Sequence, residues 1–69
     1  MQPVKSSAFT HIGYDAASRL LTIRYVQGEE HQYADVPAHV HAALMRAPSM
    51  GAFVRKHVVG KYNAPKPRG

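Results

Sequence analysis

The clearest alternation of apolar and polar positions runs from residue 19 to residue 26. Leu21, Ile23 and Tyr25 fall on one face of an extended chain, and the residues between them are polar. This period of two is typical of a half-buried β-strand. Residues 7–14 are rich in β-branched and aromatic side chains and end at a short polar turn, so they predict a preceding strand. Residues 31–33 resume extended structure after Gln27-Gly28, which completes a predicted three-stranded antiparallel meander.

The length of the second turn decides which face the last strand's aromatic rings occupy. A three-residue loop with Gly28 in a G1 bulge places His31 and Tyr33 on the face of Leu21 and Ile23, whereas a two-residue loop places them opposite. Leu, Ile, Val and Phe together make up only 14 of the 69 residues, so the core needs its aromatic residues. We therefore favour the first register, with Tyr33 largely buried and His31 partly buried. The second register would leave both rings exposed for base stacking.

The apolar period lengthens after Asp35, which indicates helices. A stripe recurring every three or four residues predicts a helix over residues 37–46, with Pro37 in its first turn and Asp35 near its positive end. The residues of this stripe are Val36, Val40, Ala43, Leu44 and Ala47.

A second helix is predicted after Pro48, which disfavours helical geometry at the preceding residue. Ser49 is a good N-cap, and Gly60 suits the C′ position beyond the last turn. The apolar side of this helix is predicted to hold Phe53, Val54, His57 and Val58.

These elements predict one α+β domain over residues 1–62, in which the meander is followed by two short helices packed on one face. A chain of 69 residues supports a single core. Residues 63–69 contain two prolines and no large apolar side chain, and we expect a flexible basic tail there.

Composition excludes several classes of function. The chain has no Cys, which removes disulfides and thiolate metal sites. Its apolar runs are too short to span a membrane or to form a signal peptide, so we expect a soluble cytoplasmic protein. The four carboxylates are scattered, and no nucleophile is selected by its spacing. We therefore expect no enzymatic activity and no cofactor.

Five histidines invite a metal hypothesis, which their spacing argues against. His39 and His41 are two apart and point to nearly opposite sides of a helix. His11 and His31 face opposite sides of the sheet in the favoured register. We expect no metal site, with surface histidines on the first helix.

The net charge of +5 is divided unevenly. Residues 1–45 carry a net charge of −1, and residues 46–69 carry +6 without any acidic residue. The cations of this second part are Arg46, Arg55, Lys56, Lys61, Lys66 and Arg68. Such a basic segment is typical of polyanion binding, with nucleic acid the commonest intracellular candidate. Alternatively, these side chains serve only to keep the protein soluble.

The start of the second helix is a candidate anion site. Ser49 and Gly51 flank free backbone N–H groups that can hold a phosphate, and Arg55 and Lys56 can extend this site. The competing interpretation is that Gly51 allows close packing of the helix. The predicted nucleic-acid or anion-binding residues are Arg46, Ser49, Gly51, Arg55, Lys56 and Lys61.

The chain contains several short motifs, of which the most specific are Ile12-Gly13-Tyr14-Asp15 and the segment from Val36-Pro37 to Ser49-x-Gly51. These motifs resemble the KTSC domain family, which occurs at the C-terminus of some lysyl-tRNA synthetases and as free-standing bacterial proteins. The resemblance extends from about Val4 to Tyr62. The family's central Tyr-x-Tyr is His31-Gln32-Tyr33 in this chain, so the first position offers less stacking area.

The resemblance implies a possible role in RNA binding. Together with the charge it predicts a non-catalytic module that binds RNA or another nucleic acid through the second helix and the tail. The alternative is a protein-interaction module or small homo-oligomer that uses an exposed sheet edge or Phe9, Leu20 and Val26 on the second face of the sheet.

Overall fold

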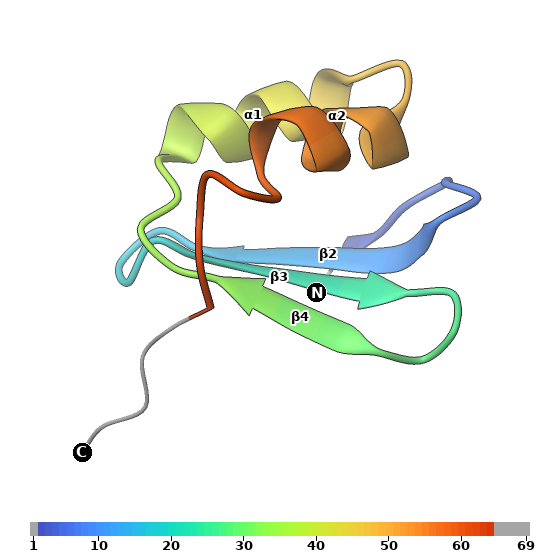
Figure 1. Cartoon of the computed structure of the whole chain (residues 1–69), viewed down its shortest axis with the longest axis horizontal. Coiled ribbons are helices and arrows are strands. Elements are labelled where there is room, and N and C mark those ends of the chain that lie inside the picture. The colour runs from blue at the N-terminus through green and yellow to red at the C-terminus, as the bar shows by residue number, and fades with distance from the viewer. Residues whose placement is uncertain (1, 65–69) are drawn as a thin grey trace.

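An antiparallel sheet lies beneath two helices in a computed structural model that describes residues 2–64. Figure 1 shows both helices on the same face of the sheet, which confirms the predicted α+β class. The strands are β1 (Gln2–Pro3), β2 (Phe9–Asp15), β3 (Leu20–Tyr25) and β4 (Glu30–Tyr33), and the helices are α1 (Ala38–Arg46) and α2 (Met50–His57).

The sheet has four strands in the order β1-β2-β3-β4, so the predicted number of three was wrong. The additional strand β1 pairs Gln2 with Ile12 and Pro3 with His11. Two residues are too few to show a periodic pattern, and Pro is tolerated at such a sheet edge. For this reason the sequence carried no signal for β1.

The predicted register of the second hairpin is confirmed. Leu21 pairs with Tyr33 and Ile23 with His31, so these four side chains share the face beneath the helices. The loop has three residues, because the Tyr25 N–H donates to the Glu29 carbonyl at 2.8 Å. Gly28 has φ +97°, a conformation that glycine adopts at little cost in a G1 bulge.

A second irregularity, in β2, overturns the expected position of Phe9. The register shifts between Phe9 and His11, so that Phe9 pairs with Tyr25 and Ile12 pairs with Ile23. The shift turns Phe9 toward the helices, where it is only 2% exposed. A β-bulge inserts one residue and exchanges the faces on either side of it. Phe9 therefore belongs to the core and not to the second face of the sheet.

The two helices form close to their predicted positions but differ in detail. Pro37 is the N-cap residue of α1, without a side-chain cap, and is not in its first turn. Ser49 is the N-cap of α2 as predicted, and its Oγ accepts a hydrogen bond from the Ala52 N–H at 3.3 Å. Gly60, with φ +88°, lies in the turn after the C-cap residue Val58 and is not at C′.

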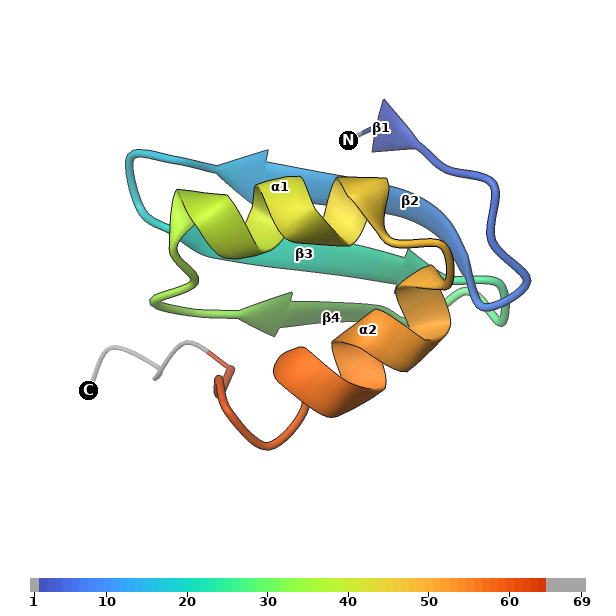
Figure 2. The same ribbon diagram turned by 90° about the horizontal axis from the view of Figure 1, so that it is seen from above.

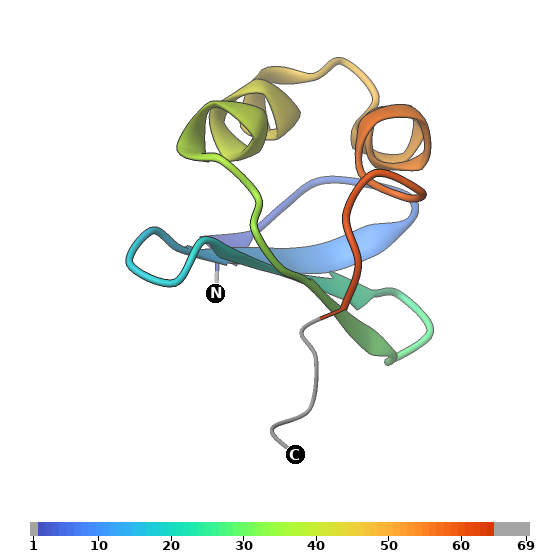
Figure 3. The same ribbon diagram turned by 60° about the vertical axis from the view of Figure 1, so that its left-hand side comes forward.

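Figure 2 shows α1 running along the sheet above β2 and β3, while α2 crosses at an angle near β4. Eight buried apolar side chains fill the space between the layers seen in Figure 3. Ala43 and His57, which were predicted on the apolar stripes, are exposed. The core consists of Phe9, Ile12, Leu21, Ile23, Val36, Leu44, Val54 and Val58.

The expected flexible tail, residues 63–69, lies mostly outside the described residues. Of the two that are described, Asn63 is attached to the sheet, because its carbonyl accepts a hydrogen bond from the Ala34 N–H at 2.8 Å. Any untethered tail thus starts no earlier than Ala64. None of the helices within residues 2–64 has the length and apolar character needed to cross a membrane.

Candidate nucleic-acid interface

The predicted basic residues surround helix α2 on exposed positions. Arg46 ends α1, Arg55 and Lys56 lie in the last turn of α2, and Lys61 follows in the next turn. Within residues 2–64, the acidic side chains with a basic partner are Glu30, paired with Arg24, and Glu29, whose carboxylate lies 3.8 Å from the His31 Nε2, so neither contact involves these four cations. This part of the surface therefore presents positive charge that no described acidic side chain neutralises.

Arg55 and Lys56, which were both predicted to extend the anion site at the start of α2, do not lie in the same site. Consecutive helical residues point about 100° apart, and the two side chains line different cavities on opposite flanks of α2. Gly51 shares its cavity with Arg55, whereas Ser49 shares one with Lys56. The structure thus divides the predicted anion site between the two flanks of the helix.

A third cavity, polar and about 250 Å³ in volume, lies beside the first turn of α2. It brings Ser49 and Gly51 next to Lys5, Ser6 and Ser7 from the segment before β2. The Ser6 Oγ accepts a hydrogen bond from the Ala8 N–H at 3.1 Å, which orders that segment. Sequence analysis did not include Lys5 in the candidate anion site, because it lies more than forty residues before Ser49 along the chain.

Close packing does not account for the absence of a side chain at Gly51. A Cβ atom there would lie 3.6 Å from the Ala8 Cβ, which is an ordinary van der Waals contact. Gly51 does lie close to Ala8, as the competing interpretation of close packing expects, but an alanine would fit at this distance, so the packing does not require glycine. The missing side chain instead leaves open space in the cavity beside Arg55.

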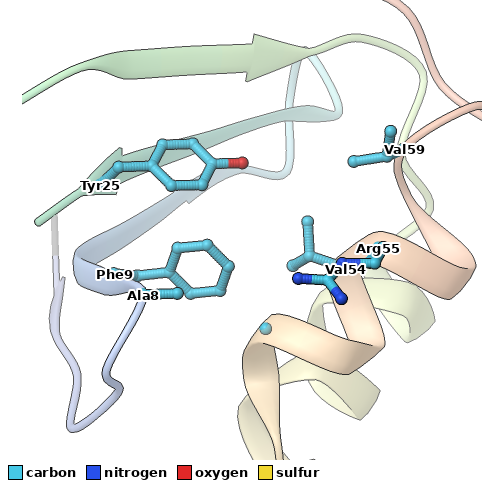
Figure 4. A pocket seen from close by; sticks show the side chains of 7 residues that line it. Ala8, Phe9, Tyr25, Val54, Arg55 and Val59 are labelled. Carbon is cyan, nitrogen blue, oxygen red and sulfur yellow. The ribbon is translucent and has the colours of Figure 1, made fainter. Parts of the chain in front are cut away.

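That cavity has a volume of about 270 Å³ and lies between the sheet and α2. Figure 4 shows the Phe9 and Tyr25 rings projecting from neighbouring strands toward the helix. The two rings meet edge to face, with centroids 5.0 Å apart. We call this cavity the aromatic groove; it is lined by Ala8, Phe9, Tyr25, Gly51, Val54, Arg55 and Val59.

Tyr25 keeps its proton at neutral pH. Burial is the main cause that raises the pKa of Tyr25 to about 12, and the neighbouring Tyr33 hydroxyl and Glu29 carboxylate add to the effect. The hydroxyl therefore remains a neutral hydrogen-bond donor and acceptor. Figure 4 shows it directed along the groove toward Val59.

His31 and Tyr33, predicted to be either core or stacking residues, take intermediate roles. Tyr33 is half-buried and packs against the core, so it is less covered than expected. His31 is exposed, which corrects its predicted partial burial, and it presents its ring to Tyr25 at 5.0 Å and 88°. Both lie on the helix-facing side and not on an open stacking surface.

The opposite flank of α2 contains a second apolar cavity, of about 280 Å³. There the Phe53 and His57 rings lie 4.7 Å apart, with Lys56 beside them. We call it the outer groove; its other lining residues are Ala47, Pro48, Ser49 and Ala52.

Histidines do not combine into a metal site within residues 2–64, where no three His, Asp or Glu side chains are grouped to hold an ion. His41 is not the surface residue we expected. It is half-buried, and its ring stacks on Tyr14 with centroids 4.8 Å apart.

Known proteins resemble this chain along nearly its whole length. The family model described as KTSC domain matches residues 5–62. A protein of Tsukamurella paurometabola is 41% identical over 64 residues, which cover 93% of this chain and 96% of that protein. The crystal structure of a KTSC domain protein from Yersinia pestis superposes with a TM-score of 0.88 at 37% identity, covering 97% of this chain and 94% of that one.

Proposed function

This chain belongs to the KTSC domain family, and we propose that it is a non-catalytic module that binds single-stranded RNA or another nucleic acid through the basic surface around α2. The observation that carries the proposal is the charge of residues 46–69, which include six cations and no acidic residue. The four of these cations that are described are all exposed. Phosphate contacts by such side chains supply most of the affinity in non-specific nucleic-acid binding.

Within residues 2–64, the positions of the acidic side chains favour a binding role over acid–base catalysis. All four acidic side chains are exposed, whereas acid and base catalysis by carboxylates needs shielded, converging groups. Those side chains are Asp15, Glu29, Glu30 and Asp35.

The sheet face opposite the helices offers weaker support for the alternative of a protein-binding surface. Phe9 has left that face for the core, and Leu20 is only partly exposed. The remaining large apolar side chain, Val26, is 53% exposed. One such side chain is less than the contiguous patch that marks an interface.

Binding of a labelled 12-nucleotide single-stranded RNA, followed by fluorescence anisotropy, tests the proposal. We expect weak binding at ~50 mM salt, and a slope of log K against log salt approaching about −4 if all six cations contact phosphates. Changing Arg55 and Lys56 together to Glu should remove most of the binding. The matched control changes Arg19 and Arg24 to Glu, which alters the net charge equally but away from α2.

Circular dichroism should show both double variants folded, because all four positions are exposed. Equal affinities of the two double variants would contradict a role for α2. Failure of the wild type to bind RNA at low salt would reject the function and favour a protein-interaction module.

A further inference from the structure

We infer that the aromatic groove is a pocket for one unstacked nucleobase of a bound single strand, with Arg55 contacting the phosphate beside that base. This inference rests on the proposed function and adds to it, because the charge around α2 can hold a phosphate backbone without contacting any base. It assigns Tyr25, Gly51 and Val59 to base recognition.

The size of the groove suits one ring system. Its volume of about 270 Å³ is just below the roughly 300 Å³ at which sites for drug-sized ligands begin. Two of its walls are fixed by the core, since Phe9 and Val54 are each 2% exposed. Their edges therefore provide a rigid apolar floor that is present before any ligand binds.

The chemistry of the lining also fits a base attached to a phosphate. Most of the wall is apolar, and the polar side-chain groups are the Tyr25 hydroxyl and the Arg55 guanidinium. An aromatic ring offers a face to any base, and a protonated phenol can donate to or accept from a base edge. Figure 4 shows the Arg55 guanidinium extending from α2 toward the rings, where it can bind the anionic backbone.

Charge distinguishes this groove from an ordinary apolar contact surface. Arg55, which lines the groove, forms no ion pair with the acidic side chains of residues 2–64, so the groove has a positive charge on its wall. A polyanion with flat apolar groups complements both features at once. We therefore assign the groove to a nucleic acid and not to an apolar protein segment.

Gly51 provides a test that fills the groove and leaves its walls intact. A Cβ at this position meets only the Ala8 Cβ, at 3.6 Å, and replacing a helical Gly favours the helix. Gly51→Leu should therefore fold while its side chain occupies the space of the base. The matched control is Ala52→Leu, which adds a similar side chain on the outer groove of the same helix.

The probes are a labelled 12-nucleotide oligouridine and an abasic strand of the same length. Loss of stacking by one base should weaken oligouridine binding by Gly51→Leu between about 5-fold and 100-fold. Binding of the abasic strand should be unchanged, and Ala52→Leu should resemble the wild type with both probes. If Gly51→Leu fails to fold, Val59→Asn serves instead, because Val59 is 50% exposed and an uncharged polar side chain at that edge removes an apolar contact to the base without repelling the backbone.

Titration with uridine 5′-monophosphate, followed by NMR, separates the two proposals. Shifts of the Tyr25 and Val59 resonances in the wild type, absent in Gly51→Leu, support the pocket even if no long strand binds. Strand binding without such shifts, or equal binding of oligouridine by Gly51→Leu and Ala52→Leu, overturns the pocket but leaves the charged interface. Shifts caused by an acidic, tryptophan-containing peptide and not by the nucleotide also overturn it.

Discussion

The two ends of the β2–β3 ribbon each place a tyrosine beneath the helices, but they use it differently. Near Leu21, Tyr14 donates its hydroxyl hydrogen to the Val36 carbonyl at 2.6 Å and stacks on His41 of α1. At the other end, the Tyr25 ring lies nearly perpendicular to the rings of Phe9 and His31 and borders the aromatic groove. One tyrosine holds a helix in place, whereas the other forms the wall of an open cavity.

The two helix starts differ in a corresponding way. Pro37, the N-cap of α1, makes no side-chain cap hydrogen bond, whereas Ser49 caps α2. Because the N-terminus of α1 has no side-chain cap, the contacts of Tyr14 with Val36 and His41 contribute more to the stability of that end of the helix. Helix α2 has its own cap and carries cations in its last turn, where they interact favourably with the helix dipole. Its place on the sheet is held by the buried Val54 and Val58, so it can leave space on its flanks.

The largest expected effect on stability comes from removing the Phe9 ring. This ring belongs to the single core that supports both ends of the β2–β3 ribbon. Phe9→Ala should lower the free energy of unfolding by about 3 to 5 kcal/mol, the usual range for a buried aromatic ring. Tyr14→Ala should cost less, since Tyr14 is only half-buried. Urea denaturation of both variants measures the difference. An equal or larger loss for Tyr14→Ala would mean that the contacts of Tyr14 with Val36 and His41 stabilise the fold at least as much as burial of Phe9 does.

Removing only the hydroxyl group of each tyrosine compares the contributions of Tyr14 and Tyr25 to stability without disturbing their rings. Tyr14→Phe removes the hydrogen bond to Val36 and should cost about 0.5 to 1.5 kcal/mol. Tyr25→Phe keeps its ring contacts and borders open space, so it should change stability by less than Tyr14→Phe. Urea midpoints of the two variants at neutral pH decide this. A larger loss in Tyr25→Phe would show that Tyr25 also has a structural role.

Sequence periodicity predicted the parts of the fold in which one chain segment determines its own geometry. The alternation at Leu21 and Ile23 identified the strand and Gly28 offered a bulge position, but two hairpin registers remained, and the need to bury aromatic residues selected the one that the structure has. The cap at Ser49 was visible because N-capping is a local property. Phe9 was placed on the wrong face because a bulge is specified by pairing with β3 and leaves no mark within β2.

The candidate site was less predictable, because it depends on contacts between distant segments. The cations were evident in the sequence, but their separation onto two flanks of α2 follows from where the helix lies on the sheet. The aromatic groove joins Tyr25 of β3 to Gly51 and Val59, and Lys5 joins the polar cavity from the other end of the chain. Likewise, the stack of Tyr14 on His41 has no local signal.

The smallest expected effect is a dependence of α1 on pH. Partial burial lowers the pKa of His41 below its ordinary value near 6.5, so the folded protein binds a proton less readily than the unfolded chain. The stabilisation from neutral His41 is complete above about pH 6.5 and decreases as the pH falls through the unfolded and then the folded pKa. Thermal unfolding between pH 7.5 and pH 5.5 should show this decrease.

His41→Phe isolates this contribution from those of the other four histidines. Phe keeps a flat ring against Tyr14 but cannot be protonated, so its unfolding free energy should lack the His41 term. The stability of the wild type relative to His41→Phe should thus fall as the pH is lowered, most steeply below about pH 6.5. The hydrogen bond from Tyr14 to the Val36 carbonyl does not involve His41 and should persist in both proteins. A difference independent of pH would show that the stack of Tyr14 on His41 tolerates a protonated imidazole.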